Sequence, residues 1–191
     1  MDQAIEALLK AHKEAVAQFE ASSLPKLEQI AAFVGTSIEK GGCVYLCGNG
    51  GSAADCQHIA GEFIGRFQRE RVPFPAVALS TDTSVITCIS NDYSFDDIFA
   101  RQVEALAKPG DILWAFSTSG KSPNVVKAAK AAKNKGAAVV AFTGQPGRSL
   151  EKLADFCICS NAALTCTAQE IHVLAYHLIC ELIDRRFCDK R

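Results

Sequence analysis

The spacing of apolar residues in the first 40 positions is helical. Apolar side chains recur every three or four residues over positions 5–19, and again over positions 24–38. Ser22 and Ser23 interrupt this pattern, and Pro25 suits the first turn of a new helix. The pattern therefore predicts two N-terminal helices in residues 1–40, the second of which ends at a glycine pair.

These two helices form an N-terminal helical arm that a minimal α/β unit does not need. The arm could cap the sheet or mediate oligomerisation, and we expect the second role. His12 lies on the apolar face of the arm. A single histidine in such a position is more typical of a packed core group than of a ligand.

From residue 41 onward, short apolar runs alternate with helical patterns, as in a parallel sheet covered by helices on both faces. The fold class predicted is α/β, a three-layer, doubly wound, flavodoxin-like arrangement with a long C-terminal helix. We expect residues 1–191 to form a single domain, with residues 41–191 as the α/β core. The five predicted strands are Cys43–Cys47, Ala76–Ser80, Ile112–Phe116, Ala138–Phe142 and Phe156–Cys159.

The helical patterns of the core cover residues 84–90, 95–107, 123–135 and 165–187. Ser94 is the expected N-cap of the second of these helices. The last helix is apolar around most of its circumference, which is typical of a buried helix. Burial between subunits would achieve this in a chain of this size.

Charge and composition exclude several classes of partner. The net charge of −1 does not favour nucleic acid or an anionic membrane surface. No apolar run approaches the about 18 residues of a membrane span, and the N-terminus lacks the pattern of a signal peptide. The nine cysteines are odd in number, form no C-x-x-C pair and mostly lie in apolar elements, so we expect reduced thiols in a cytoplasmic protein.

Two strand–loop–helix crossings carry the residues most suited to chemistry. In the first, Gly48, Asn49, Gly50 and Gly51 form a turn after a strand, and Ser52 stands where a helix cap is expected. In the second, four hydroxyls crowd one turn before a helix: Ser117, Thr118, Ser119 and Ser122. Hydroxyls and free backbone N–H groups at a helix N-terminus favour a phosphate monoester over an ordinary serine-rich turn. Because ligands of doubly wound sheets bind beyond the carboxyl ends of the strands, both loops could share one ligand.

Two nucleotide motifs are only partly matched. Gly120-Lys121-Ser122 resembles the end of a P-loop, but position 115 is alanine where that motif needs glycine. Gly48, Gly50 and Ala53 fit a dinucleotide fingerprint, but the acidic residue expected after the next strand is missing. We therefore expect no nucleotide cofactor.

Two groups of ionisable residues remain. His58 and Glu62 are one helical turn apart, so they share a face of the helix that follows the first loop. A solvated contact would be the ordinary interpretation, but the pair stands close to the anion loop. Gln169 and His177 lie in the last helix, about 12 Å apart along its axis. The two side chains could bind one ion in three ways: with both fully extended, with a helix that starts only after Gln169, or with the two residues coming from different subunits.

Four stretches in this order resemble the phosphoheptose isomerases of the sugar isomerase (SIS) family, and the resemblance covers nearly the whole chain. They are GNGGSAADCQHIAGEFIGRF, TDTSVITCISNDYSFDDIFARQVEALAKPGD, STSGKSPNVV and AQEIHVLAYHLICELID. The resemblance implies interconversion of sedoheptulose 7-phosphate and D-glycero-D-manno-heptose 7-phosphate, the first step towards the ADP-heptose of lipopolysaccharide core. It also implies a cytoplasmic homotetramer with active sites at subunit interfaces.

The resemblance also assigns roles to residues. Glu62 is implied as the catalytic base and His177 as its acid–base partner. The implied zinc ligands are His58, Glu62, Gln169 and His177. The implied substrate-binding residues are Asn49, Gly50, Gly51, Ser52, Glu62, Asn91, Asp92, Ser117, Thr118, Ser119, Ser122 and Gln169.

One departure and one alternative accompany this assignment. The resembled family usually has T-x-R-I-Q-E before the last helix, whereas this chain has Thr167 and Ala168 in place of Arg and Ile. That change removes a charged contact near the site and bears on the heptose or anomer preferred. The alternative is a non-catalytic SIS protein that binds a phosphosugar or the replication initiator DnaA as a tetramer. Such relatives lack the glutamate and histidine that stand here as Glu62 and His177.

Overall fold

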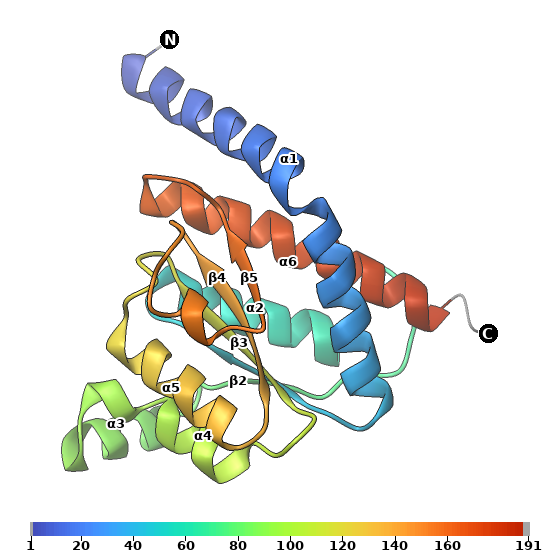
Figure 1. The fold of residues 1–191 in the computed structure, drawn as a ribbon, viewed down its shortest axis with the longest axis vertical. Helices are drawn as coiled ribbons and strands as arrows, with labels where there is room; N and C mark the ends of the chain where they lie inside the picture. Colours follow the sequence, from blue (N-terminus) through green and yellow to red (C-terminus); the bar gives the residue numbers. More distant parts are fainter. Residues whose placement is uncertain (1, 189–191) are drawn as a thin grey trace.

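The computed structural model describes residues 2–188, and it contains one five-stranded parallel sheet between two helical layers (Figure 1). The strand order is β2-β1-β3-β4-β5. The strands are β1 Val44–Cys47, β2 Ala76–Ala78, β3 Ile112–Ser117, β4 Ala138–Thr143 and β5 Phe156–Cys159. The helices are α1 Gln3–Glu39, α2 Gly51–Ile64, α3 Thr83–Asp92, α4 Ala100–Leu106, α5 Pro123–Asn134 and α6 Thr165–Cys188, with short 3-10 helices η1 Phe95–Asp97 and η2 Glu151–Leu153.

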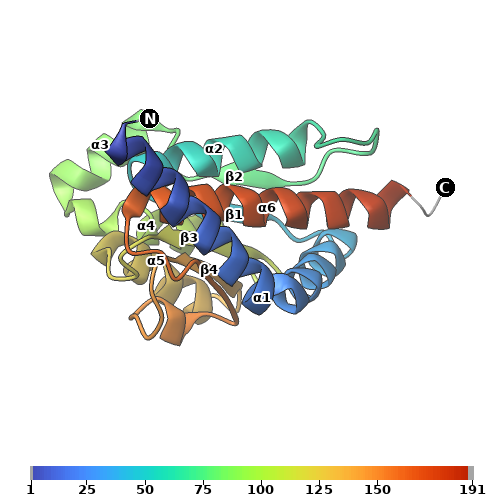
Figure 2. The same cartoon turned by 90° about the horizontal axis from the view of Figure 1, so that it is seen from above.

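Alternate residues of the buried strands face the two helical layers. Leu46, Trp114 and Phe142 pack with α1, α2 and α6 on one face. Leu113 and Val139 pack with α3, α4 and α5 on the other face. Figure 2 shows α2 and α6 lying side by side above the sheet. The predicted three-layer, doubly wound fold is confirmed.

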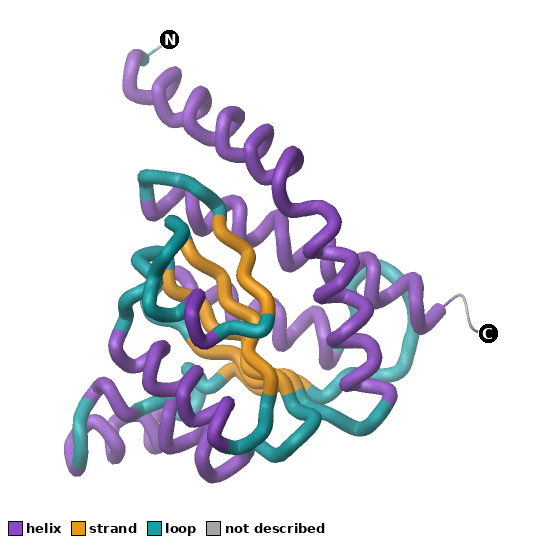
Figure 3. The backbone as a smooth tube through the Cα atoms, in the orientation of Figure 1, coloured by secondary structure: helices purple, strands orange, loops and turns teal. Residues whose placement is uncertain are grey.

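The prediction of two N-terminal helices is wrong, because α1 is one helix with Pro25 inside it. The chain bends in this region but stays helical, as the tube in Figure 3 shows. Proline has no N–H to donate to the preceding turn, and the Ser22 hydroxyl donates to the carbonyl of Gln18 at 2.8 Å. The serines therefore mark a kink in a continuous helix.

The second half of α1 packs against α6, whereas its first turns project away from the sheet (Figure 1). Exposed apolar side chains line these first turns, with Ile5 and Leu8 about half exposed. The sequence suggested that His12 is a packed core group, and the structure shows that it is not. Its ring is 43% exposed, and its Nδ1 lies 2.7 Å from Glu170 Oε2 at the start of α6. The oligomerisation role of the arm stays a prediction.

The predicted helix over residues 95–107 is divided into η1 and α4. Ser94 caps the first piece, as predicted, because its hydroxyl accepts the Asp96 N–H at 3.1 Å. The regular α-helical spacing of hydrogen bonds begins only with the Val103 N–H to the Phe99 carbonyl. Two tight turns therefore precede the α-helix.

The parallel register places the carboxyl ends of the central strands at one edge of the sheet. Cys47 pairs with Ala115, Ser117 with Thr143, and Thr143 with Cys159. The loops that follow β1, β3, β4 and β5 consequently meet at this edge. Among residues 2–188, none of the helices combines the length and the apolar character needed to cross a membrane.

Candidate functional site

The first loop, residues 48–50, turns the chain from β1 into α2. Gly50 is at a positive φ of 56° and takes the N-cap position. Ser52 is not the cap that the sequence predicted. It is buried inside the first turn of α2, because its Cβ lies against Gly48, where a side chain would not fit.

An amide pair ties this loop to the N-terminus of α5. Asn49 Nδ2 donates to Asn124 Oδ1 at 2.9 Å, and Asn124 Nδ2 donates back to Asn49 Oδ1 at 2.8 Å. Asn124 also accepts the backbone N–H of Val125. The Asn49 side chain therefore holds the two loops together. Asn124 was not singled out from the sequence, although it directly follows the serine-rich turn.

The second loop, residues 117–122, gathers its hydroxyls as predicted. Ser117 Oγ lies 2.9 Å from Ser122 Oγ and 3.3 Å from Ser119 Oγ. The Lys121 N–H donates to Ser119 Oγ. Ser122 is the N-cap of α5 but makes no side-chain cap bond. Pro123 has no N–H and the Val125 N–H is taken by the Asn124 side chain, so the Asn124 N–H is the group that the start of α5 leaves for an anion.

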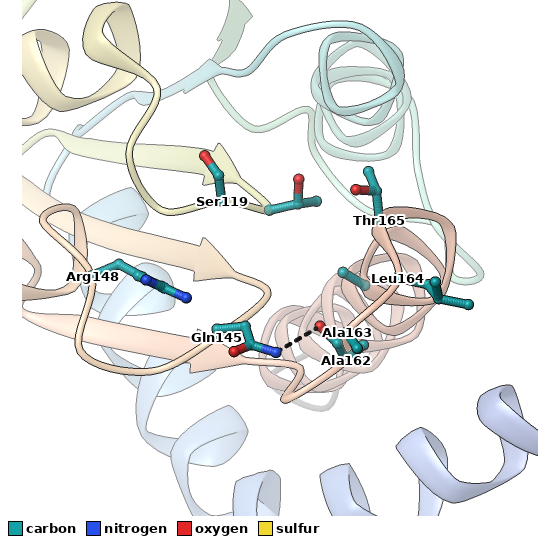
Figure 4. A pocket seen from close by; sticks show the side chains of 9 residues that line it. Ser119, Gln145, Arg148, Ala162, Ala163, Leu164 and Thr165 are labelled. Atoms are coloured by element: carbon teal, nitrogen blue, oxygen red, sulfur yellow. Dashed lines mark hydrogen bonds between the residues drawn. The ribbon is translucent and has the colours of Figure 1, made fainter.

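A cavity of about 370 Å³ opens beside this loop, at the carboxyl ends of β3 and β4 (Figure 4). Its polar lining includes Thr118, Ser119, Gln145, Arg148 and Thr165. Gln145 is held by a bond to the Ala162 carbonyl. Gln145 and Arg148 were missed in the sequence. Their place just after a central strand was the available signal, since loops at that edge line the ligand site.

The ionisable residues converge on a second place, between α2 and α6. Donor atoms of His58, Glu62 and His177 all lie within 4.8 Å of one another. His58 Nε2 is 3.0 Å from Glu62 Oε1, and the rings of His58 and His177 are 5.1 Å apart. Phe67 stacks on the His177 ring, with the ring centroids 5.3 Å apart.

Two features prepare these residues for chemistry. The Tyr176 hydroxyl lies 2.9 Å from His58 Nδ1 and can donate to it or accept from it, so it orients the ring in either tautomer. Burial raises the pKa of the Tyr176 phenol, which keeps it protonated. Burial and the neighbouring His58 lower the pKa of His177, so its imidazole is neutral and free to accept a proton or bind a metal. Tyr176 was missed in the sequence, although it directly precedes His177.

A model of the SIS domain matches residues 8–144. The chain belongs to the SIS domain family. It is 50% identical over 161 residues to the phosphoheptose isomerase of Roseiflexus sp., which covers 84% of this chain and 82% of the relative. It is also similar to the solved phosphoheptose isomerase of Neisseria gonorrhoeae, with a TM-score of 0.90, 37% identity, and coverage of 95% and 97%. The corresponding structure from Francisella tularensis gives a TM-score of 0.91 at 34% identity, with coverage of 95% and 96%.

In this SIS domain, Gln169 stands apart from the three convergent residues. Its amide lies across Gly51, where an added Cβ would meet Gln169 Nε2 at 2.6 Å. Because α6 starts at Thr165, Gln169 and His177 are in one continuous helix and about 12 Å apart along it. One chain therefore gathers three of the four expected ligands, and Gln169 lies beside the loops.

Asn91 and Asp92 are also separate from the cavity beside the second loop. They lie exposed at the end of α3, where Asn91 Nδ2 donates to Asp92 Oδ1 at 2.9 Å. Asp92 also accepts from the Cys88 thiol. Their role as substrate contacts stays a prediction.

Proposed function

We propose that this chain is a phosphoheptose isomerase that interconverts sedoheptulose 7-phosphate and D-glycero-D-manno-heptose 7-phosphate. The observation that carries the proposal is the convergence of His58, Glu62 and His177 between α2 and α6, two helical turns along α2 from the loop that opens this helix. The relatives that match most of the chain are named phosphoheptose isomerases, which supports the same reaction. The alternative of a non-catalytic phosphosugar- or DnaA-binding protein is not favoured, because the acid–base residues are present.

The chemistry needs a carboxylate and a second acid–base group. Aldose–ketose isomerisation moves a proton between C1 and C2 through an enediol. Glu62 Oε1 is the base that removes this proton, and the adjacent His58 orients the carboxylate. His177, neutral because its pKa is lowered, moves protons between the two sugar oxygens. The hydroxyls of the second loop hold the phosphate and so position the reacting end.

The three convergent residues fit a zinc ion. They offer two imidazole nitrogens and one carboxylate, a donor set typical of catalytic zinc with an open position for substrate. Bound there, zinc would supply positive charge next to the reacting oxygens. Gln169 is expected to complete the set from another subunit, in a cytoplasmic homotetramer with one zinc per subunit. The product would serve ADP-heptose synthesis for lipopolysaccharide.

Conversion of sedoheptulose 7-phosphate by the purified protein tests this proposal, with and without chelator. Glu62→Gln keeps the shape of the side chain but cannot take a proton, so turnover should fall by about 10²- to 10⁴-fold while substrate still binds. Glu104→Gln, a matched change on the exposed surface of α4, should leave turnover unchanged. Full activity in Glu62→Gln would contradict the mechanism, and an inactive wild type would contradict the function.

A further inference from the structure

Arg148 is a cation in the cavity beside the second loop, and it has no acidic partner in the part of the chain that the structure describes. None of the ion pairs or hydrogen bonds found among residues 2–188 involves its guanidinium, and its Nε is buried without a partner. The described residues that line the cavity include no carboxylate. A buried, unpaired N–H is costly, so this group is prepared for a ligand that is not part of the chain.

The position of Arg148 is fixed by the two loops. The Gly144 N–H donates to the Thr118 carbonyl at 2.9 Å, and the Leu150 N–H donates to the Gly120 carbonyl at 3.1 Å. Between these bonds, Arg148 Cβ packs on Gly120, where an added Cβ would stand 2.4 Å away. Gly120 also has a positive φ of 63°. The close contact and the backbone conformation both favour glycine at this position.

The remaining lining of the cavity matches an anion. Thr118 and Ser119 line it and carry hydroxyls, and in Figure 4 the Arg148 side chain extends towards the space below Ser119. A guanidinium presents parallel N–H groups that match the oxygens of a phosphate. The hydroxyls, the one free N–H at the start of α5 and a guanidinium without a partner among residues 2–188 together favour a dianionic monoester.

We propose that Arg148 binds the phosphate group of the substrate, opposite the hydroxyls of the second loop. This inference rests on the proposed function, because it takes the ligand to be a sugar phosphate. The loop after β4 would then contribute to the phosphate site together with the second loop. Recognition of the phosphate would depend on the charged, bidentate guanidinium as well as on neutral hydroxyls.

The first test is steady-state kinetics with sedoheptulose 7-phosphate. Loss of a charge-assisted, two-pronged contact in Arg148→Gln should lower kcat/KM by about 10- to 100-fold, mainly through a higher KM. Arg148→Lys, which keeps the charge without the fork, should recover part of this loss. Lys152→Gln removes an equal charge from the exposed η2 segment nearby and should behave as wild type. Melting temperatures should agree among all four proteins, since the guanidinium bonds to no group within residues 2–188.

The second test is titration calorimetry with inorganic phosphate, which needs no turnover. Wild type should bind phosphate, and Arg148→Gln should bind it at least about tenfold more weakly. If wild type lacks isomerase activity but shows this difference, the proposed function fails and the role of Arg148 stands. Equal KM and equal phosphate affinity in wild type and Arg148→Gln would overturn the inference. So would a wild type that binds no phosphate.

Discussion

A buried ion pair connects the segment after α2 to α6, and its removal should lower the free energy of unfolding by a measurable amount. Arg71 Nε donates to Asp184 Oδ1 at 2.7 Å, and the two side chains are only 3% and 1% exposed. Asp184 Oδ2 also accepts the backbone N–H groups of Gln68 and Arg69 at 3.0 and 3.1 Å. The carboxylate thus neutralises one buried cation and satisfies two backbone donors.

Arg71 extends this contact to the end of α2 that carries the proposed base. Its Nη2 donates to the Glu62 carbonyl at 2.6 Å, and its Nη1 donates to the Phe63 carbonyl at 2.9 Å. These belong to the last turn of the helix, whose carbonyls have no partner within the helix. Arg71 therefore acts as a side-chain cap that fixes the backbone of Glu62.

We predict that Asp184→Ala lowers the free energy of unfolding by about 3–5 kcal/mol, because it leaves Arg71 as an uncompensated buried charge. A domain has only about 5–15 kcal/mol in total, so the variant should be marginally folded. Asp184→Asn keeps the shape but also removes the charge that compensates Arg71, and its NH2 group faces N–H donors, so it should lose a similar amount of about 3–5 kcal/mol.

Urea unfolding followed by circular dichroism, at one protein concentration, measures these differences. Glu70→Gln is the matched control, since the exposed pair Arg66–Glu70 is 3.8 Å long and worth little. The double variant Arg71→Met/Asp184→Leu should be more stable than Asp184→Ala, because no charge is left unpaired. A loss below about 1 kcal/mol in Asp184→Ala, or a double variant that is no more stable than Asp184→Ala, would refute this reasoning.

Two further predictions concern histidines. Tyr176→Phe removes the hydroxyl that orients His58 and should lower zinc affinity or turnover by about 10- to 100-fold, measured by competition with a chelating dye and by kcat; unchanged values would exclude an orienting role. Burial lowers the pKa of His172 from 6.5 to about 4, so the folded state favours the neutral ring. The associated stability, up to about 3 kcal/mol, is complete above pH 6.5 and is lost as the pH falls towards 4. Melting curves across this range should lose part of their pH dependence in His172→Gln, and an identical profile would contradict the assignment.

Hydrophobic periodicity predicted all five strands, since each central strand is an apolar run that is buried on both faces. The same reasoning failed in α1. Ser22, Ser23 and Pro25 are typical of a helix boundary, but packing of the second half of the helix against α6 keeps the chain helical through them. Local preferences at these three positions were therefore overridden by tertiary contacts that no local pattern encodes.

The candidate site divides in a similar way. Spacing alone placed His58 and Glu62 on one face, because that relation is local to a helix. The contact of His58 with Tyr176 depends on how α2 and α6 pack, and the pair of Asn49 with Asn124 depends on the register of two loops. The position of Arg148 depends on the strand order and on the backbone hydrogen bonds that join the loop after β4 to the second loop. Such contacts between distant segments appear only once the fold is known.

The packing of α2 against α6 also explains how one site could both bind a phosphate and carry out acid–base chemistry. Gly51 contacts Gln169, and seven residues later His58 contacts Tyr176, so the two helices run in the same direction and in register. The loop end of this helix pair lies beside the loops that are proposed to hold the phosphate, and the proposed acid–base end lies about 10 Å further along the axis. Binding of a remote phosphate can thus orient carbons at the far end, which is how binding energy is converted into rate. Because rigid helices set this separation, the distance between phosphate and reacting carbons becomes a criterion for choosing the substrate.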